Sequence, residues 1–279
     1  MGRIPTIFVS HGSPMMAEHP SENDKETQEF FESLGEDLLA WGVQGVVCIS
    51  AHWQEKSHAG KPPRVAVTST RHPELIYDFY GFPDHLYKIK YNGQGNSNLA
   101  KKVQKAIQSQ NLTCDLDDRR GFDHGAWVPL KLMFPDTNAQ NESQVPIVQL
   151  SLSSTLDPEF HVAVGKALQP LRDQGILILG SGGAVHNLRE LFGPKQQWSS
   201  AFIAALTDAM KSHGEVRREA ASSLTKLPIF RQAHPTSEHF MPVAVVIGTA
   251  HDDENATVIH DVYPKYAPNF ALHAYKIGA

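Results

Sequence analysis

The chain has 279 residues, of which 41% are hydrophobic and 20% charged, and its formal net charge is −5. This balance gives no electrostatic case for binding nucleic acid or an anionic membrane surface. No apolar run reaches the roughly 18–20 residues that a membrane-spanning helix needs, and the N-terminus lacks a signal-peptide pattern. Two cysteines, Cys48 and Cys114, do not make a disulfide framework. We therefore expect a cytoplasmic protein, and the sequence leaves its oligomeric state open.

Short apolar runs, typical of buried strands, alternate with segments in which apolar residues recur at helical spacing. In chain order the patterns predict strand Thr6–Ser10, helix Thr27–Trp41, strand Gln44–Ser50, helix Asn98–Gln108, strand Pro146–Leu150, helix Phe160–Leu171, strand Ile176–Leu179, helix Ser199–Met210 and strand Val243–Ile247. Residues 215–236 have a helical pattern first and an extended one afterwards, and Phe270–Ile277 predicts an edge strand. Alternation of this kind favours an α/β fold, namely a layered single domain over residues 1–279 with a central, largely parallel sheet flanked by helices.

Histidines are unusually frequent, with fifteen in the chain, which is roughly twice average usage. His11 follows the first apolar run, His52 follows the second within "AHW", and His186 follows a later run within "GSGGAVHNL". In open α/β sheets, ligands bind outside the carboxyl ends of the strands, so His11 and His52 are expected to converge. Neutral imidazole is the commonest protein ligand for metals. The placement therefore indicates a metal or ligand site.

Two further histidines lie in distinctive stretches, His124 in "RRGFDHGAW" and His239 in "HPTSEHF", with Asp123 and Glu238 as the adjacent carboxylates. Two histidines and one carboxylate form the facial triad of non-haem Fe(II) oxygenases. The sequence contains no HExxH, paired CxxC, Walker or GxSxG motif, so local patterns alone name no reaction. His161, early in a predicted helix, is expected to have a structural role.

Seven stretches together resemble a known family. They are "SHGSP" (10–14), "SAHW" (50–53), "YDFYGFP" (77–83), "RGFDHGAWVPL" (120–130), "VPIVQLSL" (145–152), "GSGGAVHNLR" (180–189) and "EHFMP" (238–242). In this order, and over most of the chain, they resemble the LigB-type (class III) extradiol ring-cleavage dioxygenases, in particular the DOPA 4,5-dioxygenase-like branch. The resemblance implies an oxidoreductase that opens aromatic rings.

The resemblance also implies roles for single residues. His11, His52 and His239 match metal ligands of the family. His186 matches a position that is a ligand in zinc-bound members and a catalytic base in iron-bound relatives, and His124 matches an active-site acid/base or substrate contact. Because better-studied members of the wider superfamily use a glutamate as third ligand, Glu238 is an alternative metal ligand, and the choice among Glu238, His186 and His239 to complete the ligand set stays open.

The implied reaction is cleavage of a catechol ring, with DOPA as one candidate, next to its hydroxyls by O2. Fe(II) is expected for activity because triplet O2 reacts poorly with a singlet catechol unless a metal relays electrons. Zn²⁺ has no accessible redox change, although it can occupy the same imidazoles. His124 and His186 are expected to move the protons. The expected partners are a small catecholic substrate and O2.

Substrate recognition is less defined by the sequence. Aromatic candidates for walls around the ring are Trp53, Tyr80, Phe122 and Trp127, of which Trp127 is expected in the core. A DOPA substrate needs a partner for its carboxylate, and the cationic candidates near the motifs are Arg119, Arg120 and Arg189. Each of these arginines is more often a structural salt-bridge residue.

Two other functions use the same histidines. A zinc-dependent hydrolase lowers the pKa of a bound water to about 7 and can use Glu238 as general base. A non-catalytic metal- or ligand-binding protein needs no turnover at all. Oxygen uptake with a catechol distinguishes the dioxygenase from both.

Overall fold

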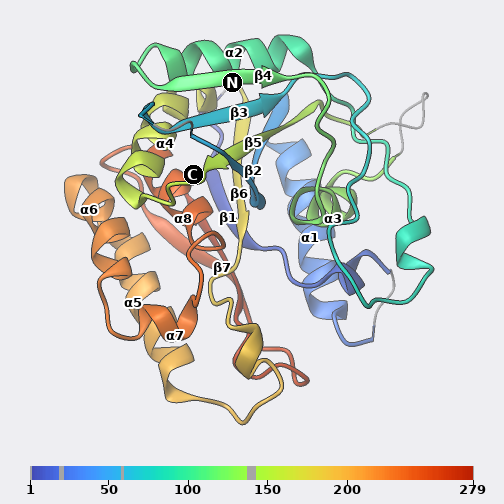
Figure 1. Cartoon of the computed structure of the whole chain (residues 1–279), viewed down its shortest axis with the longest axis vertical. Helices are drawn as coiled ribbons and strands as arrows, with labels where there is room; N and C mark the ends of the chain where they lie inside the picture. The colour runs from blue at the N-terminus through green and yellow to red at the C-terminus, as the bar shows by residue number, and fades with distance from the viewer. Residues whose placement is uncertain (1, 19–21, 58–59, 137–142, 279) are drawn as a thin grey trace.

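The structure is a computed structural model that describes residues 2–18, 22–57, 60–136 and 143–278. Its central sheet has the strand order β4-β3-β5-β2-β6-β1-β8-β7 (Figure 1). The strands are β1 (Thr6–Ser10), β2 (Gly45–Glu55), β3 (Arg64–Thr68), β4 (Thr113–Asp117), β5 (Ile147–Ser153), β6 (Ile176–Gly182), β7 (Ala256–Val262) and β8 (Leu272–Ile277). The central strands β5, β2, β6 and β1 pair in parallel, whereas β3 is antiparallel to β5, β8 to β1 and β7 to β8. The predicted α/β fold with a largely parallel central sheet is confirmed.

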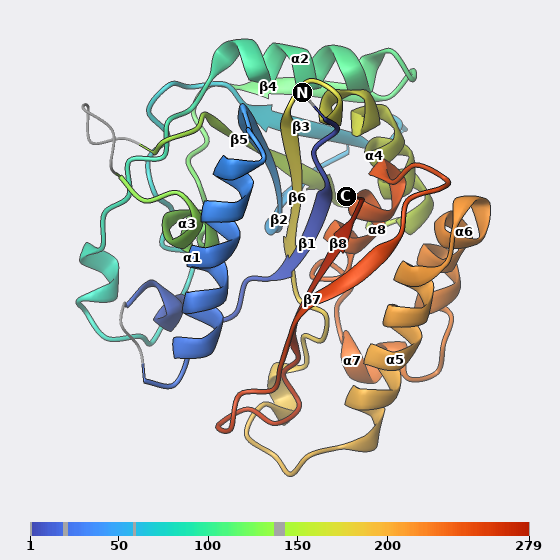
Figure 2. The same cartoon turned by 180° about the vertical axis from the view of Figure 1, so that it is seen from behind.

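Helices cover both faces of the sheet, as Figures 1 and 2 show from opposite sides. One face carries α1 and α3, which bury Phe31, Leu38 and Trp127 against it, and the other carries α2, α4, α5, α6 and α8. The helices are α1 (Lys25–Ala40), α2 (Ser97–Gln108), α3 (His124–Met133), α4 (Pro158–Arg172), α5 (Gln197–Lys211), α6 (Gly214–Thr225), α7 (Phe230–Ala233) and α8 (Met241–Thr249). Short 3-10 turns η1 (Pro14–Ala17), η2 (Leu86–Lys88) and η3 (Leu188–Glu190) lie in connecting segments. No helix of the described residues is long and apolar enough to cross a membrane.

The strand predicted over Val243–Ile247 is wrong, because this segment is the centre of helix α8. Every residue of α8 is buried, so the helix has no polar face, and a short apolar run of this kind cannot be told from a buried strand by periodicity. Pro242 in its first turn suits a helix start. The helix packs closely on α4, where a Cβ at Gly165 would overlap the carbonyl oxygen of Val245.

Other elements differ from their predictions in extent or place. The predicted strand Phe270–Ile277 exists as β8, but it lies between β1 and β7 and is not an edge. The segment after α6, predicted to be extended, contains the short helix α7. The sequence patterns missed β3, β4, β7 and α3. Strand β4 has a single buried residue and α3 is almost wholly buried, so neither shows the alternation that periodicity detects.

The carboxyl ends of three neighbouring strands meet at one edge of the sheet. Strand β1 ends at Ser10, and β6 ends opposite it, with Ser10 paired to Gly182. Pairing between β2 and β6 stops at Ser50. Strand β2 then continues to Glu55, past a register shift against β5, so His52 lies within the strand and not beyond its end as predicted. It still lies past the part of β2 that pairs with β6, which directs it to this edge.

Candidate metal centre and active site

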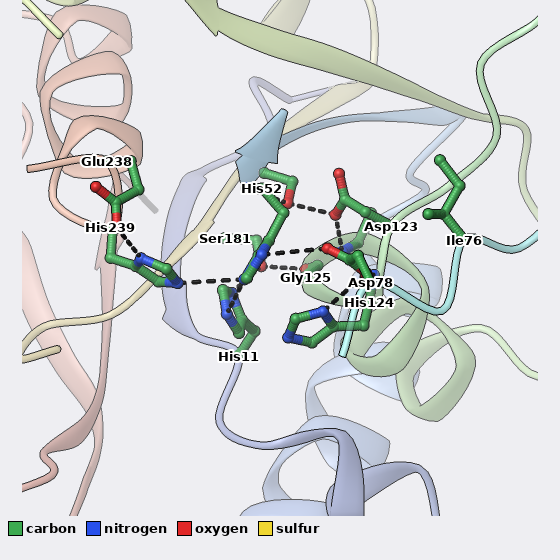
Figure 3. A network of polar contacts seen from close by, with 12 residues as sticks. His11, His52, Ile76, Asp78, Asp123, His124, Gly125, Ser181, Glu238 and His239 are labelled. Atoms are coloured by element: carbon green, nitrogen blue, oxygen red, sulfur yellow. Dashed lines mark hydrogen bonds and ion pairs between the residues drawn. The ribbon is translucent and has the colours of Figure 1, made fainter. Parts of the chain in front are cut away.

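Three histidines from separate segments bring their imidazoles together at this edge (Figure 3). His11 directly follows β1, His52 lies within β2, and His239 lies in the turn before α8. The Nε2 atom of His52 is 3.2 Å from Nε2 of His11 and 3.2 Å from Nε2 of His239. The three residues that the family resemblance marks as ligands thus share one cluster, although the chain separates them widely.

The imidazole of His11 is oriented by β6. Its Nδ1 atom is 3.1 Å from the hydroxyl oxygen of Ser181. That hydroxyl donates to the carbonyl oxygen of Gly125, so toward the ring it acts as an acceptor. The Nδ1 atom of His11 therefore carries the proton, and its Nε2 atom presents a lone pair toward His52.

Carboxylates orient the other two imidazoles in the same way. Nδ1 of His52 is 3.2 Å from Oδ2 of Asp78, and Nδ1 of His239 is 3.1 Å from Oε1 of Glu238 (Figure 3). A carboxylate accepts the Nδ1 proton and leaves Nε2 as the ligand atom, which is the usual arrangement around metal-binding histidines. Glu238, an alternative ligand in the sequence analysis, here contacts the ring of His239.

This donor set fits a transition-metal ion. Lone pairs that face each other repel unless a cation lies between them, and the 3.2 Å separations match the about 3.3 Å expected between two imidazole nitrogens bound to one tetrahedral ion. Imidazole suits iron and zinc, whereas magnesium and calcium prefer oxygen ligands. The donor atoms of His11, His52 and His124 also lie within 4.8 Å of one another, as do those of His186, Glu238 and His239. The described residues therefore include a three-histidine group that can hold a metal.

Burial controls the charge of these imidazoles. Burial, followed by the neighbouring histidines, lowers the pKa of His11 and of His239 well below the ordinary value. Burial also lowers the pKa of His186 to about 4, although Glu238 opposes it. For His52, burial acts in the same direction, but the hydrogen bond to Asp78 and the charges of Asp123, Asp78 and Glu238 outweigh it and raise the pKa. At neutral pH three of these rings are neutral, which is the form that binds metals.

Asp78, in the loop after β3, joins His52 to His124. Its Oδ1 atom accepts hydrogen bonds from Nδ1 and from the backbone N–H of His124, both at 2.9 Å, while Oδ2 faces His52. Burial alone would raise the pKa of Asp78, but the hydrogen bonds from His124 and His52 hold that pKa below its usual range. One carboxylate thus positions two of the predicted site histidines. Sequence reasoning missed this residue, although it lies within the family-like stretch "YDFYGFP".

Asp123 does not contact the ring of His124, although it precedes it in the chain. Its carboxylate is fully buried and caps helix α3 by accepting from the backbone N–H of Ala126. It also accepts from the hydroxyl of Ser50 at 2.6 Å, from the amide of Gln149, and from Arg120 at 3.3 Å. Asp123 therefore fixes the start of α3, and with it the position of His124, through the backbone.

His186 joins the cluster from the far side of His239. The two rings stack with their centroids 3.3 Å apart and their planes 6° from parallel. The backbone N–H of His186 donates to the carbonyl of Ala233, which holds the loop after β6 against α7. All five histidines predicted for the site are therefore in one cluster.

A cavity of about 560 Å³ lies over the cluster, and its lining includes His11, His52, His124 and His186. The walls are mostly apolar, with Phe79, Phe82 and Phe270 among them. Four aromatic residues were candidates for the walls around the ring. One of them, Tyr80, is among the described residues that line the cavity. The others, Trp53, Phe122 and Trp127, are buried in the core. The core prediction for Trp127 is confirmed.

Residues 5–273 match the family model described as the catalytic LigB subunit of aromatic ring-opening dioxygenase. The chain belongs to this family. It is thus a LigB-type aromatic ring-opening dioxygenase, and the resemblance seen in the seven sequence stretches is confirmed.

Relatives and a solved structure extend over nearly the whole LigB-type chain. It is 37% identical to "4,5-DOPA dioxygenase extradiol" of Beta vulgaris, over 92% of this chain and 90% of that protein. It is 31% identical to a protein of the same name from Escherichia coli K12, over 92% and 89%. The crystal structure of an uncharacterized protein from Escherichia coli K12 superposes with a TM-score of 0.77 at 25% identity, covering 99% of this chain and all of that one.

Proposed function

We propose that this LigB-type dioxygenase opens a catechol ring beside its two hydroxyls and inserts both atoms of O2, at a metal ion held by His11, His52 and His239. The observation that carries the proposal is that Nε2 of His52 lies 3.2 Å from Nε2 of His11 and 3.2 Å from Nε2 of His239. An oxygen acceptor contacts the Nδ1 atom of each of these rings. Relatives named as extradiol DOPA dioxygenases support the reaction type. They favour it over the zinc hydrolase that the histidine cluster alone leaves open.

The proposed metal for activity is Fe(II), which would relay electrons from the bound catechol to O2. Zn²⁺ binds the same imidazoles without supporting this redox step. Glu238 acts on the metal through His239, whose Nδ1 proton it accepts. We place the whole chain, residues 1–279, in one catalytic domain, because residues just after β1, within β2 and in the turn before α8 all contribute to the same cluster.

The proton transfers fall to His124 and His186, which both line the cavity. Nδ1 of His124 is held by Asp78 at 2.9 Å, so Nε2 is left to take a proton from a catechol hydroxyl. Asp78 then stabilises the imidazolium, much as the aspartate of a catalytic triad stabilises its histidine. His124 returns the proton later in the cycle. His186, with its pKa lowered to about 4, is neutral at pH 7 and serves as a second acceptor.

Anaerobic loading with Fe(II), followed by a panel of catechols and then O2, tests the proposal. We expect oxygen uptake that matches the catechol consumed, together with a yellow ring-opened product. Loading with Zn²⁺ is the matched control and should give neither. Absence of uptake with every catechol by protein that has bound Fe(II) would contradict the proposal. Hydrolysis of esters or amides by the zinc-loaded protein would then point to the alternative.

A further inference from the structure

We infer that the catechol accepted by this cavity carries no carboxylate on its ring substituent, and that a neutral or amine-bearing substituent is preferred. The inference rests on the proposed function and names its substrate class. Three independent features of the cavity lead to it: the absence of lysine and arginine among its described lining residues, the presence of a buried aspartate, and an apolar mouth.

The described lining of the cavity offers no lysine or arginine to a carboxylate. None of the three arginines near the family motifs lines the cavity. The side chain of Arg119 is 95% exposed, Arg189 is exposed, and the guanidinium of Arg120 lies 4.7 Å from the centroid of the Trp53 ring and contacts Asp123. A carboxylate that leaves water for a mostly apolar cavity without a cationic partner is strongly disfavoured.

An aspartate makes the cavity still less favourable for an anion. Asp24, just before α1, is 4% exposed and lines the cavity beside Tyr266, whose hydroxyl donates to its Oδ1 atom at 2.7 Å. Asp24 has further interactions besides this one, and a carboxylate accepts several hydrogen bonds, so an ammonium group of a substrate can join the partners already present. A substrate carboxylate placed near Asp24 meets a like charge, which opposes binding.

The mouth of the cavity presents apolar surface to the substituent. Tyr80, Leu188 and Phe192 line it, and they are 90%, 59% and 79% exposed. Exposed apolar side chains gathered at one opening are typical of a ligand-binding surface. They suit an uncharged carbon substituent and provide no partner for an anion.

Four catechols whose short side chains carry different charged groups test the inference. Dopamine carries the ammonium alone, DOPA carries ammonium and carboxylate, 3,4-dihydroxyphenylpropionate carries the carboxylate alone, and 4-propylcatechol carries neither. We expect kcat/KM of the Fe(II)-loaded enzyme to be at least about tenfold higher for dopamine than for DOPA, and for 4-propylcatechol than for dihydroxyphenylpropionate. Dissociation constants measured without O2 should show the same order, which assigns the difference to binding.

Two rim variants test the role of charge. Asp24→Asn keeps an acceptor for Tyr266 and removes the negative charge, so the ratio of dopamine to DOPA should fall by at least about threefold. Leu188→Arg adds a cation at the exposed mouth and should lower the same ratio, whereas Leu188→Gln, a neutral polar control, should not.

The outcomes separate this inference from the proposed function. If DOPA and dihydroxyphenylpropionate are opened and bound as well as their carboxylate-free partners, the inference is overturned and the dioxygenase function stands. If neither Asp24→Asn nor Leu188→Arg changes the ratio, electrostatics does not select the substrate and the inference is likewise overturned. If none of the four probes is opened or bound by protein that retains Fe(II), the inference falls together with the proposed function.

Discussion

His11 and His52 face each other through their Nε2 atoms at 3.2 Å, although they are 41 positions apart in the chain. The parallel strands β1 and β2 are both paired to β6, which lies between them. Their carboxyl ends therefore reach the same edge, and Ser181 of β6 holds the far side of the His11 ring. The sheet positions the two imidazoles before any metal binds, so little ordering entropy remains to be lost on metal binding.

Replacement of a metal-binding histidine should release the metal. His11→Ala, His52→Ala and His239→Ala each remove one nitrogen from the cluster, and we expect metal content after dialysis to fall from near stoichiometric to a small fraction. Elemental analysis of purified protein measures it. His213→Ala, at an exposed histidine near the start of α6, is the control and should keep the metal. If His239→Ala retains the metal fully, the third ligand is Glu238 or His186 and not His239.

His124→Ala should separate metal binding from turnover. We assign proton transfer and not metal binding to His124, so this variant should retain the metal and lose roughly 10²–10⁴-fold in kcat. Elemental analysis and oxygen uptake on the same sample provide both readouts. A donor atom of His124 lies within 4.8 Å of those of His11 and His52. If His124→Ala loses the metal as completely as His11→Ala, His124 is a metal ligand.

Asp78→Asn should weaken both metal binding and catalysis. The amide replaces the acceptor that holds the Nδ1 protons of His52 and His124, and loss of such an outer contact typically costs about 10–100-fold in metal affinity or activity. Competition with a chromogenic chelator measures the affinity. Asp118→Asn, whose native side chain is 86% exposed, is the matched control. An unchanged affinity in Asp78→Asn would show that Asp78 does not orient the ligand.

Gly125→Ala should disturb the cluster without removing a ligand. A Cβ at this position would lie 2.6 Å from the hydroxyl oxygen of Ser50, 2.8 Å from Cδ2 of His52 and 3.2 Å from Cε1 of His11. The two rings must move, so metal affinity is expected to fall while the helix itself gains propensity. Chelator competition and thermal unfolding separate the two effects. Affinity equal to that of the native chain would mean that the rings tolerate the displacement.

Acid should destabilise the fold partly through His161. Its Nε2 accepts from the backbone N–H of Ser153 at 3.1 Å and its Nδ1 donates to the carbonyl of Asp157 at 2.6 Å. Burial lowers its pKa to about 4. The unfolded chain therefore binds more protons between pH 4 and the ordinary value near 6.5, so stability is full above pH 6.5 and is lost as the pH falls toward 4.

The expected contribution of His161 is about 1.4 kcal/mol for each pH unit below 6.5. Urea unfolding in the presence of a chelator, repeated from pH 7.5 to pH 4.5, measures the slope. His161→Gln lowers stability at every pH. It should also reduce the slope of the unfolding free energy against pH by about 1.4 kcal/mol per pH unit, which corresponds to one proton. An identical slope in the variant would assign the acid sensitivity to other groups.

Much of this protein is readable from its residue pattern. The apolar runs locate β1, β2, β5 and β6, because strands buried on both faces are continuously hydrophobic. Amphipathic spacing likewise locates α1, α2, α4 and α5. The residues after those strands indicate His11 and His52 as a pair, and the family-like stretches add His124, His186 and His239.

The residue pattern cannot distinguish a fully buried helix from a fully buried strand. Helix α8 has the composition of a buried strand and was predicted as one. A run of apolar residues shows that a segment is buried but not which backbone hydrogen bonds it makes, and packing against α4 and the sheet decides that.

The sequence by itself determined the α/β class, the family and the five histidines, since these depend on local composition and on motifs that survive without coordinates. Only the tertiary structure decided which groups act together. It set Asp78 between His52 and His124, turned Asp123 toward Ser50 and Gln149, and left the cavity lining without lysine or arginine among the described residues. Hydrogen bonds and charges act over a few ångströms, and the distance in space between residues far apart in the chain is a property of the folded sheet alone.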